Sequence, residues 1–199
     1  DMKVCPFSSS VHKAGQPQGG VSYPICRATT AEAVYQACWE QVELVEQTDQ
    51  YSLATVLLIT PDFASASAEG FDAFADTLNG ALASLGLDDQ MQLVFFHPEY
   101  VFRDGKQRLG DDDGGEAANF ARRSPYPMIN ILRTPQVRAA QKGIPTGSVY
   151  ATNEKNLGSV GAAELRAMLA TCDWSALEGR SYVPHVTRSG VEEGKLRAD

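Results

Sequence analysis

Residues 55–61 read TVLLITP, a short run of branched apolar side chains that ends at a proline. Such a run is typical of a β-strand buried on both faces, because an amphipathic helix is longer and spaces its apolar residues three and four apart. We therefore expect a central strand over Thr55–Thr60. Towards the C-terminus, MQLVFFHP (Met91–Pro98) and MINIL (Met128–Leu132) predict two more apolar strands.

A further strand is expected upstream, over VSYPICRA (Val21–Ala28). Pro24 lacks the N–H that a central strand donates, so this strand belongs at a sheet edge or carries a bulge. Residues 1–20 mix Pro, Gly and Ser with little periodicity and predict an irregular surface segment.

Two amphipathic helices are expected between these strands. The first begins near Thr29, which has capping-box spacing to Glu32, and ends at about Gln47. The second covers about residues 68–85 and stops at Gly86. Their apolar residues recur at three- and four-residue spacing: Val34, Cys38, Val42 and Val45, then Phe71, Phe74, Leu78, Leu82 and Leu85.

The C-terminal half predicts two more helices and one loop. Thr134 and Pro135 have the residue types of an N-cap and a first-turn proline, and residues 162–172 form a last apolar helical pattern. Residues 103–116, rich in Gly and Asp, predict a mobile surface loop.

The alternation of strands and helices predicts an α/β fold: a single layered domain with a four-stranded or larger sheet covered by helices. We expect this domain to span residues 1–178 and an extended, charged tail to span 179–199. The pattern leaves open whether the sheet is wholly parallel or mixed.

Composition excludes several classes of partner. The 199 residues are 43% hydrophobic and 21% charged, with a net charge of −8. An acidic protein of this kind is repelled by a phosphate backbone and by an anionic membrane, so we expect no nucleic-acid partner. The longest apolar run is far shorter than the roughly 20 residues that cross a membrane, so we expect no transmembrane segment.

The cysteines predict a reducing compartment. Cys5, Cys26, Cys38 and Cys172 include no CxxC pair, which argues against a zinc ribbon or a thioredoxin-type motif. We interpret them as reduced, mostly buried thiols of an intracellular protein. Because the chain begins at Asp1, either the cytoplasm or an organelle (plastid or mitochondrion), after removal of a transit peptide, fits this interpretation.

His97 ends an apolar strand, where ligand sites of open α/β sheets gather. It serves as a general acid or base on one interpretation. On the other, it is a structural histidine that hydrogen-bonds a backbone carbonyl.

The second candidate is RRSPYP, residues 122–127. It places two arginines, a hydroxyl and a proline-framed tyrosine just before a strand, which suits bidentate binding of a carboxylate or phosphate. The alternative is a rigid surface turn whose arginines pair with Asp111–Asp113.

Further candidate site residues are Cys5 and His12 near the start of the chain and Arg133 at the end of an expected strand. Cys5 is either a nucleophile whose thiolate His12 or His97 stabilises, or a small buried hydrophobe. A metal site of these three residues has no support from spacing, so we predict no metal, and the sequence leaves the cofactor unknown. Arg133, at a strand end, either joins the site or pairs with a surface carboxylate.

Three motifs, CPFSSSVHKAG, FHPEYVF and ANFARRSPYPMINILR, resemble in order and spacing a bacterial and organellar-type family catalogued as domain of unknown function fourteen-fifteen. The resemblance covers most of residues 4–172, and it brings no activity with it. The positions that match the family's motifs are Cys5, Pro6, Phe7, His12, His97, Pro98, Tyr100, Asn119, Arg123, Ser124, Pro125, Tyr126, Pro127 and Arg133.

The chain departs from the family's pattern in a strand, in a loop and in its tail. Asn130 stands where the family usually has histidine or another polar residue, the loop over 103–116 is longer, and the tail after about Trp174 is an addition. The longer loop and the tail suggest contacts with a protein partner.

Two functions follow from these candidates. In the first, the chain is an enzyme that acts on a small anionic metabolite. Arg123 and Arg133 bind the anion, His97 moves a proton, and Cys5 or His12 supplies a second proton-transfer group. The residues that orient the substrate are then Tyr100, Asn119, Ser124 and Tyr126.

In the second, the chain is a non-catalytic subunit or assembly factor of a larger complex, and the motif residues form a rigid structural knot. An enzyme requires the arginine and histidine side chains to converge on an open pocket, whereas a knot buries them against one another.

Overall fold

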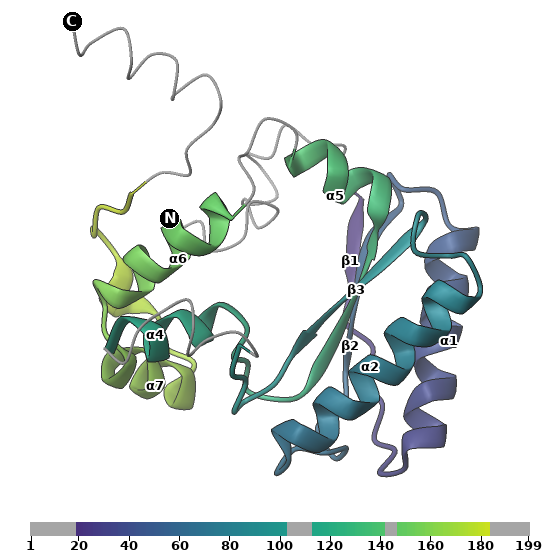
Figure 1. Cartoon of the computed structure of the whole chain (residues 1–199), viewed down its shortest axis with the longest axis horizontal. Helices are drawn as coiled ribbons and strands as arrows, with labels where there is room; N and C mark the ends of the chain where they lie inside the picture. The colour runs from purple at the N-terminus through teal and green to yellow at the C-terminus, as the bar shows by residue number, and fades with distance from the viewer. Residues whose placement is uncertain (1–18, 103–112, 142–146, 184–199) are drawn as a thin grey trace, which may run out of the picture. The chain divides into compact units, whose positions relative to one another are not determined.

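A computed structural model describes residues 19–102, 113–141 and 147–183 (Figure 1). The contacts among these residues form two compact units. We call residues 19–100 with 122–139 the sheet unit, and residues 101–121 with 140–183 the helical unit. The expectation of one domain over residues 1–178 stays a prediction.

The sheet unit holds a four-stranded mixed sheet in the order β1-β2-β4-β3. β1 pairs with β2 in parallel, whereas β4 pairs antiparallel with both β2 and β3, which answers the question that the pattern left open. Three strands lie where the sequence predicts them: β2 (Leu53–Ile59), β3 (Met91–Phe96) and β4 (Met128–Arg133). β1 (Gly20–Ser22) covers only the start of the strand expected over Val21–Ala28, which continues as an isolated bridge from Ile25 to Ile59.

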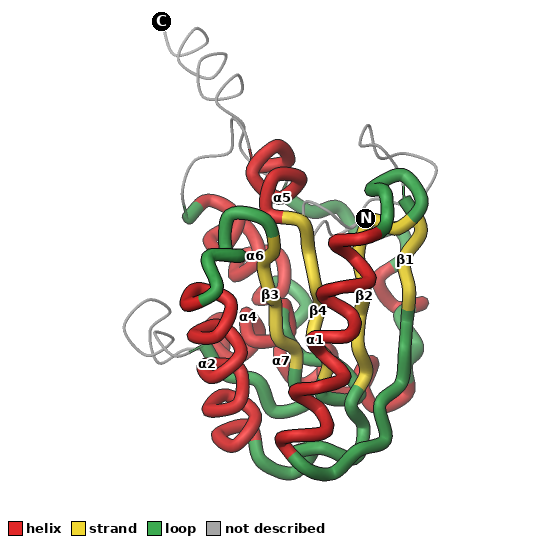
Figure 2. The backbone as a smooth tube through the Cα atoms, turned by 90° about the vertical axis from the view of Figure 1, so that its right-hand side faces the viewer, coloured by secondary structure: helices red, strands yellow, loops and turns green. Residues whose placement is uncertain are grey.

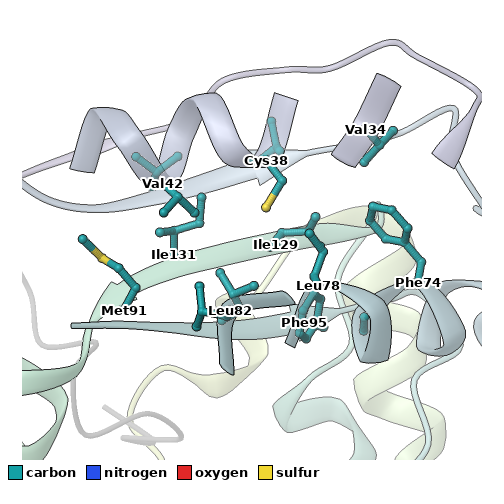
Figure 3. Close-up of a cluster of buried hydrophobic side chains, with 14 of the residues drawn as sticks. Val34, Cys38, Val42, Phe74, Leu78, Leu82, Met91, Phe95, Ile129 and Ile131 are labelled. Atoms are coloured by element: carbon teal, nitrogen blue, oxygen red, sulfur yellow. The ribbon is translucent and has the colours of Figure 1, made fainter. Parts of the chain in front are cut away.

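Two long helices cover the same face of this sheet. Figure 2 shows α1 (Ala31–Gln47) and α2 (Ala68–Ser84) side by side in front of the strands. Their apolar faces meet alternate residues of the strands, and Figure 3 shows Cys38, Leu78 and Ile129 among the side chains of this core. The predicted helix faces are therefore confirmed, except that Leu85 is exposed.

The expectation that the strand over Thr55–Thr60 is buried on both faces is wrong. Val56 and Leu58 point into the core, whereas Thr55, Leu57 and Ile59 are only half-buried. The reason is that α1 and α2 lie on one face, so the period-2 alternation of a strand leaves every second side chain outside their core. The central position of β2 is confirmed.

The helix ends differ from the sequence prediction by one residue. Thr30, not Thr29, caps α1, and its hydroxyl accepts a hydrogen bond from the N–H of Ala33 at 3.4 Å. Ser67 caps α2 in the same way. Gly86 follows α2 with φ of +67°, the left-handed conformation expected of a glycine stop.

The helical unit contains α4 (Asp113–Ala118), α6 (Ser148–Gly158) and α7 (Ala162–Thr171), with short 3-10 helices at Asn119–Ala121 and Ser175–Leu177. α5 (Thr134–Gln141) begins in the sheet unit. The helical unit has its own small core: Ala117, Leu157, Val160, Leu165 and Met168.

Sequence reasoning missed two features of the helical unit. It did not predict α6, and the loop expected over 103–116 is helical from Asp113, while residues 103–112 lie outside the described chain. The start of the expected tail is held in place: Arg180 pairs with Glu164 at 2.6 Å, and the backbone of Val183 exchanges two hydrogen bonds with the Asn156 amide. Residues 184–199 are not described.

In the described ranges, the longest helices are too short and too polar to traverse a bilayer. The thiols of Cys26, Cys38 and Cys172 are all free. Cys172 is exposed rather than buried, because it forms the left-handed C-cap of α7 with φ of +52° instead of extending the apolar helical face.

Candidate functional site

His97 directly follows β3 and is almost wholly buried, with 1% of its surface exposed. Its Nε2 lies 3.0 Å from the carbonyl oxygen of Ala64, and its Nδ1 accepts the backbone N–H of Glu99 at 3.0 Å. Since a carbonyl only accepts, Nε2 carries the proton and the ring is the neutral Nε2–H tautomer. The ring packs against Phe71, with 5.5 Å between centroids.

Hydrogen bonds connect the turn His97–Tyr100 to both arginines of RRSPYP, Arg122 and Arg123. The backbone N–H of His97 donates to the carbonyl of Arg122 at 3.2 Å, and Nε of Arg123 donates to the carbonyl of Tyr100 at 3.1 Å. The guanidinium of Arg122 lies over the Tyr100 ring, 5.7 Å from its centroid. The structure therefore brings the backbone of His97 and Tyr100 next to Arg122 and Arg123, and a shared site of their side chains stays a prediction.

The rest of RRSPYP is held by backbone contacts. The buried hydroxyl of Ser124 donates to the carbonyl of Tyr126 at 2.5 Å. The carbonyl of Pro127 accepts the N–H and the hydroxyl of Thr60, at 2.9 and 3.2 Å. Tyr126 is 53% exposed, so this turn presents an aromatic residue to solvent.

Arg133 lies at the other end of the sheet. It pairs with Met91 at the start of β3, whereas His97 follows the end of that strand, six residues and about 20 Å further along. Its guanidinium donates to the carbonyls of Val45, Thr48 and Leu53. A cation here complements the negative C-terminal end of α1, so Arg133 joins neither His97 nor Arg123.

Asn119 belongs to the helical unit. Its Oδ1 accepts the N–H of Phe102 at 3.0 Å, and its amide donates to Glu116 at 3.2 Å. Glu116 also pairs with Arg166 at 3.0 Å. Cys5 and His12 lie outside the described residues, so their place in a common site stays a prediction.

Residue Ala64 is a part of the site that sequence reasoning missed. It adopts φ of +50°, a left-handed conformation that costs an alanine about 1 kcal/mol. Its carbonyl accepts two hydrogen bonds, one from Nε2–H of His97 and one from the backbone N–H of Ser67. These two bonds stabilise the strained turn, and no residue type in PDFASAS signals it.

The chemistry available to the described residues is limited. Burial raises the pKa of the Cys38 thiol to about 12, so Cys38 stays protonated and cannot serve as a nucleophile near neutral pH. The described ranges contain no cluster of three or more His, Cys, Asp or Glu side chains suited to a metal ion. What the geometry offers is a buried imidazole with two backbone partners, and a backbone hydrogen bond that joins its residue to Arg122.

A family model described as "Protein of unknown function (DUF1415)" matches residues 1–167. This match confirms the family resemblance, and it includes all three motifs. No curated protein and no solved structure matches the chain.

Proposed function

We propose that the chain, which belongs to the DUF1415 family, is a non-catalytic subunit or assembly factor of a larger protein complex. The observation that carries this proposal is the state of His97. Both of its ring nitrogens are engaged by backbone groups of the same unit, and the ring is almost wholly buried.

Proton transfer by His97 would require one of these bonds to break. Loss of the Nε2 bond would release the strained turn at Ala64, and loss of the Nδ1 bond would leave the Glu99 N–H without that acceptor. A buried group left without its partner costs about 1–3 kcal/mol. An imidazole in this setting is better suited to fixing two turns than to exchanging protons.

The other motif side chains support the same proposal. Nε of Arg123, the hydroxyl of Ser124 and the guanidinium of Arg133 each donate to a backbone carbonyl. Side chains that donate to the main chain fix the path of a loop, which is how a rigid surface is built around a sheet. In this proposal the motif preserves a shape, and the shape is what a partner recognises.

Arg122 favours a second candidate, the enzyme that acts on a small carboxylate or phosphate. Its guanidinium has the Tyr100 ring as a partner, and no carboxylate of the described residues lies within salt-bridge distance of it. In this candidate the guanidinium of Arg122, which lies over the Tyr100 ring, binds the anion.

A thermal-shift screen separates the two candidates. Phosphate, sulfate and a panel of mono- and dicarboxylates are tested against the wild type and Arg122→Gln. A site occupied at 100 times its Kd adds about 2.7 kcal/mol, which raises the Tm of a chain this size by roughly 5–10 °C. The subunit proposal expects no such shift.

Arg138→Gln is the matched control, because Arg138 is an exposed arginine paired with Asp89. A second arm asks whether the tagged chain, expressed at its native level, elutes with a stoichiometric partner well above its own 21.5 kDa. Elution of the chain alone, together with an anion shift that Arg122→Gln abolishes and Arg138→Gln retains, would overturn the subunit proposal in favour of the enzyme.

A further inference from the structure

We propose that the sheet edge formed by β1 and residues 23–26, which no described strand pairs with, binds an extended segment of a partner protein. That segment is rich in alternating apolar and basic residues and adds to the sheet as a fifth strand. This inference rests on the proposed function, since it names the surface by which the subunit would bind.

The outer side of β1 and of the extended residues 23–26 has backbone groups that pair with no described strand. β1 is the terminal strand of the sheet, and the bonds of residues 20–26 to the β2 side come from one side of the chain: the N–H of Gly20, the carbonyl of Pro24 and the N–H of Cys26. Because successive residues of a strand point their backbone groups to opposite sides, Val21, Tyr23 and Ile25 direct theirs away from β2. No described strand pairs with that side.

These same three residues form an exposed apolar strip. Their exposed fractions are 42% for Val21, 62% for Tyr23 and 60% for Ile25. They alternate with Ser22, Pro24 and Cys26, which are half-buried, and Cys26 packs against the core beneath α1 and α2. The strip therefore lies on the sheet face that these helices leave uncovered, next to the half-buried Leu57 and Ile59 of β2.

An edge of this kind is specific for an extended chain. Natural edge strands are protected by charged side chains, by shortness, by proline or by a bulge. β1 is short and its register shifts between Gly20 and Val21, so what leaves this edge open to a partner is its lack of charge. Residues 19–26, GGVSYPIC, contain no charged side chain. Pro24 does not block pairing, because its missing N–H is on the side that faces β2. Added strands gain affinity from the main chain and specificity from alternate side chains.

Charge selects a basic partner rather than a second copy. The described sheet unit has twelve Asp and Glu side chains against five Arg and no Lys. α1 contributes four glutamates and α2 three carboxylates, and neither helix has a cation. Two copies, each with a net charge of −8, repel one another, whereas a segment with lysine or arginine is attracted.

The test uses the full chain and a defined probe, a capped peptide of about eight residues that alternates valine and lysine. Binding is measured by fluorescence anisotropy, and amide hydrogen exchange is followed by NMR. We expect saturable binding and slower exchange at the N–H groups of Val21, Tyr23 and Ile25. The N–H groups of Gly20 and Cys26 are already bonded to β2 and should change little.

Two variants test whether the peptide binds at this edge. Tyr23→Lys places a cation in the apolar strip and should weaken binding at least tenfold. Leu85→Lys makes the same change of charge at an exposed residue after α2 and should change binding less than twofold. Unchanged NMR spectra away from residue 23 verify that the first variant is folded.

Three results would overturn the inference. A valine–glutamate peptide that binds equally well removes the charge argument. Slower amide exchange at residues away from this edge, and not at it, would show that the peptide binds elsewhere. Concentration-dependent dimerisation of the chain alone, with the same three amides protected, assigns the edge to a second copy.

Failure here is distinguishable from failure of the proposed function. If Tyr23→Lys still elutes with its stoichiometric partner and the peptide does not bind, the edge is wrong and the subunit function stands. If the wild type elutes alone and binds an anion through Arg122, the subunit function falls whatever the peptide does.

Discussion

The His97 ring joins two turns of the sheet unit, so its removal should cost stability before anything else. His97→Ala leaves the Glu99 N–H without its acceptor, removes the donor to the strained Ala64 turn and opens a space beside Phe71. We expect the free energy of unfolding, measured in urea, to fall by about 2–4 kcal/mol.

The matched control is Thr77→Ala, which removes an exposed hydroxyl bonded within α2 and should change stability by less than about 0.5 kcal/mol. A His97→Ala protein as stable as the wild type would mean that the ring is not a structural tie, and the case for catalysis by His97 would reopen.

Sequence reasoning at this scale identified residues but not their partners. The backbone of His97 and Tyr100 does lie next to Arg122 and Arg123, because the end of β3 lies beside the start of β4 in an antiparallel pair. The partner of Arg133 could not be predicted, because the C-terminus of α1 lies more than 80 residues away in the chain. The strained conformation of Ala64 could not be predicted either, because an alanine in a sequence does not indicate a positive φ.

Among the elements, β1 depends on how closely its first residues approach β2. A Cβ added at Gly19 would lie 2.2 Å from the carbonyl oxygen of Gln50 and 2.5 Å from the N of Ala54, both backbone atoms that cannot yield cheaply. Gly19→Ala should therefore displace β1 and lower the unfolding free energy by about 1–3 kcal/mol.

Gly80→Ala is the opposite case within α2. Nothing lies within 4 Å of its added Cβ, and alanine is the better helix former, so stability should rise by about 0.5–1 kcal/mol. Denaturant melts of the two variants check both signs. A neutral Gly19→Ala would show that β1 can shift away from β2 without loss.

Elements with a clear period were predictable, and elements defined by tertiary contact were not. α1 and α2 have apolar residues at helical spacing, and their extents agree with the sequence prediction within one or two residues. α6 was missed because it buries polar residues, among them Thr152, Asn153 and Asn156, so its apolar face is weak. The one-sided cover of β2 was also hidden, because a continuous apolar run looks the same with one face covered or two.

For the whole molecule, the division into units makes a prediction about folding. The large hydrophobic core lies entirely within residues 19–100 and 122–139. The two ends of the gap in this range are close, because His97 N–H bonds the Arg122 carbonyl and Arg123 bonds the Tyr100 carbonyl. A short Gly–Ser linker can therefore replace residues 101–121.

We expect this trimmed chain, which ends at residue 139, to unfold in a single cooperative transition and to keep the Cys38 thiol unreactive towards iodoacetamide until it unfolds. Both follow because the side chains that bury Cys38 are all retained. Circular dichroism in urea and mass spectrometry of the alkylated peptide are the measurements, and the trimmed chain with His97→Ala is the destabilised control. A trimmed chain without a cooperative transition would instead support the single domain over residues 1–178 that the sequence alone predicts.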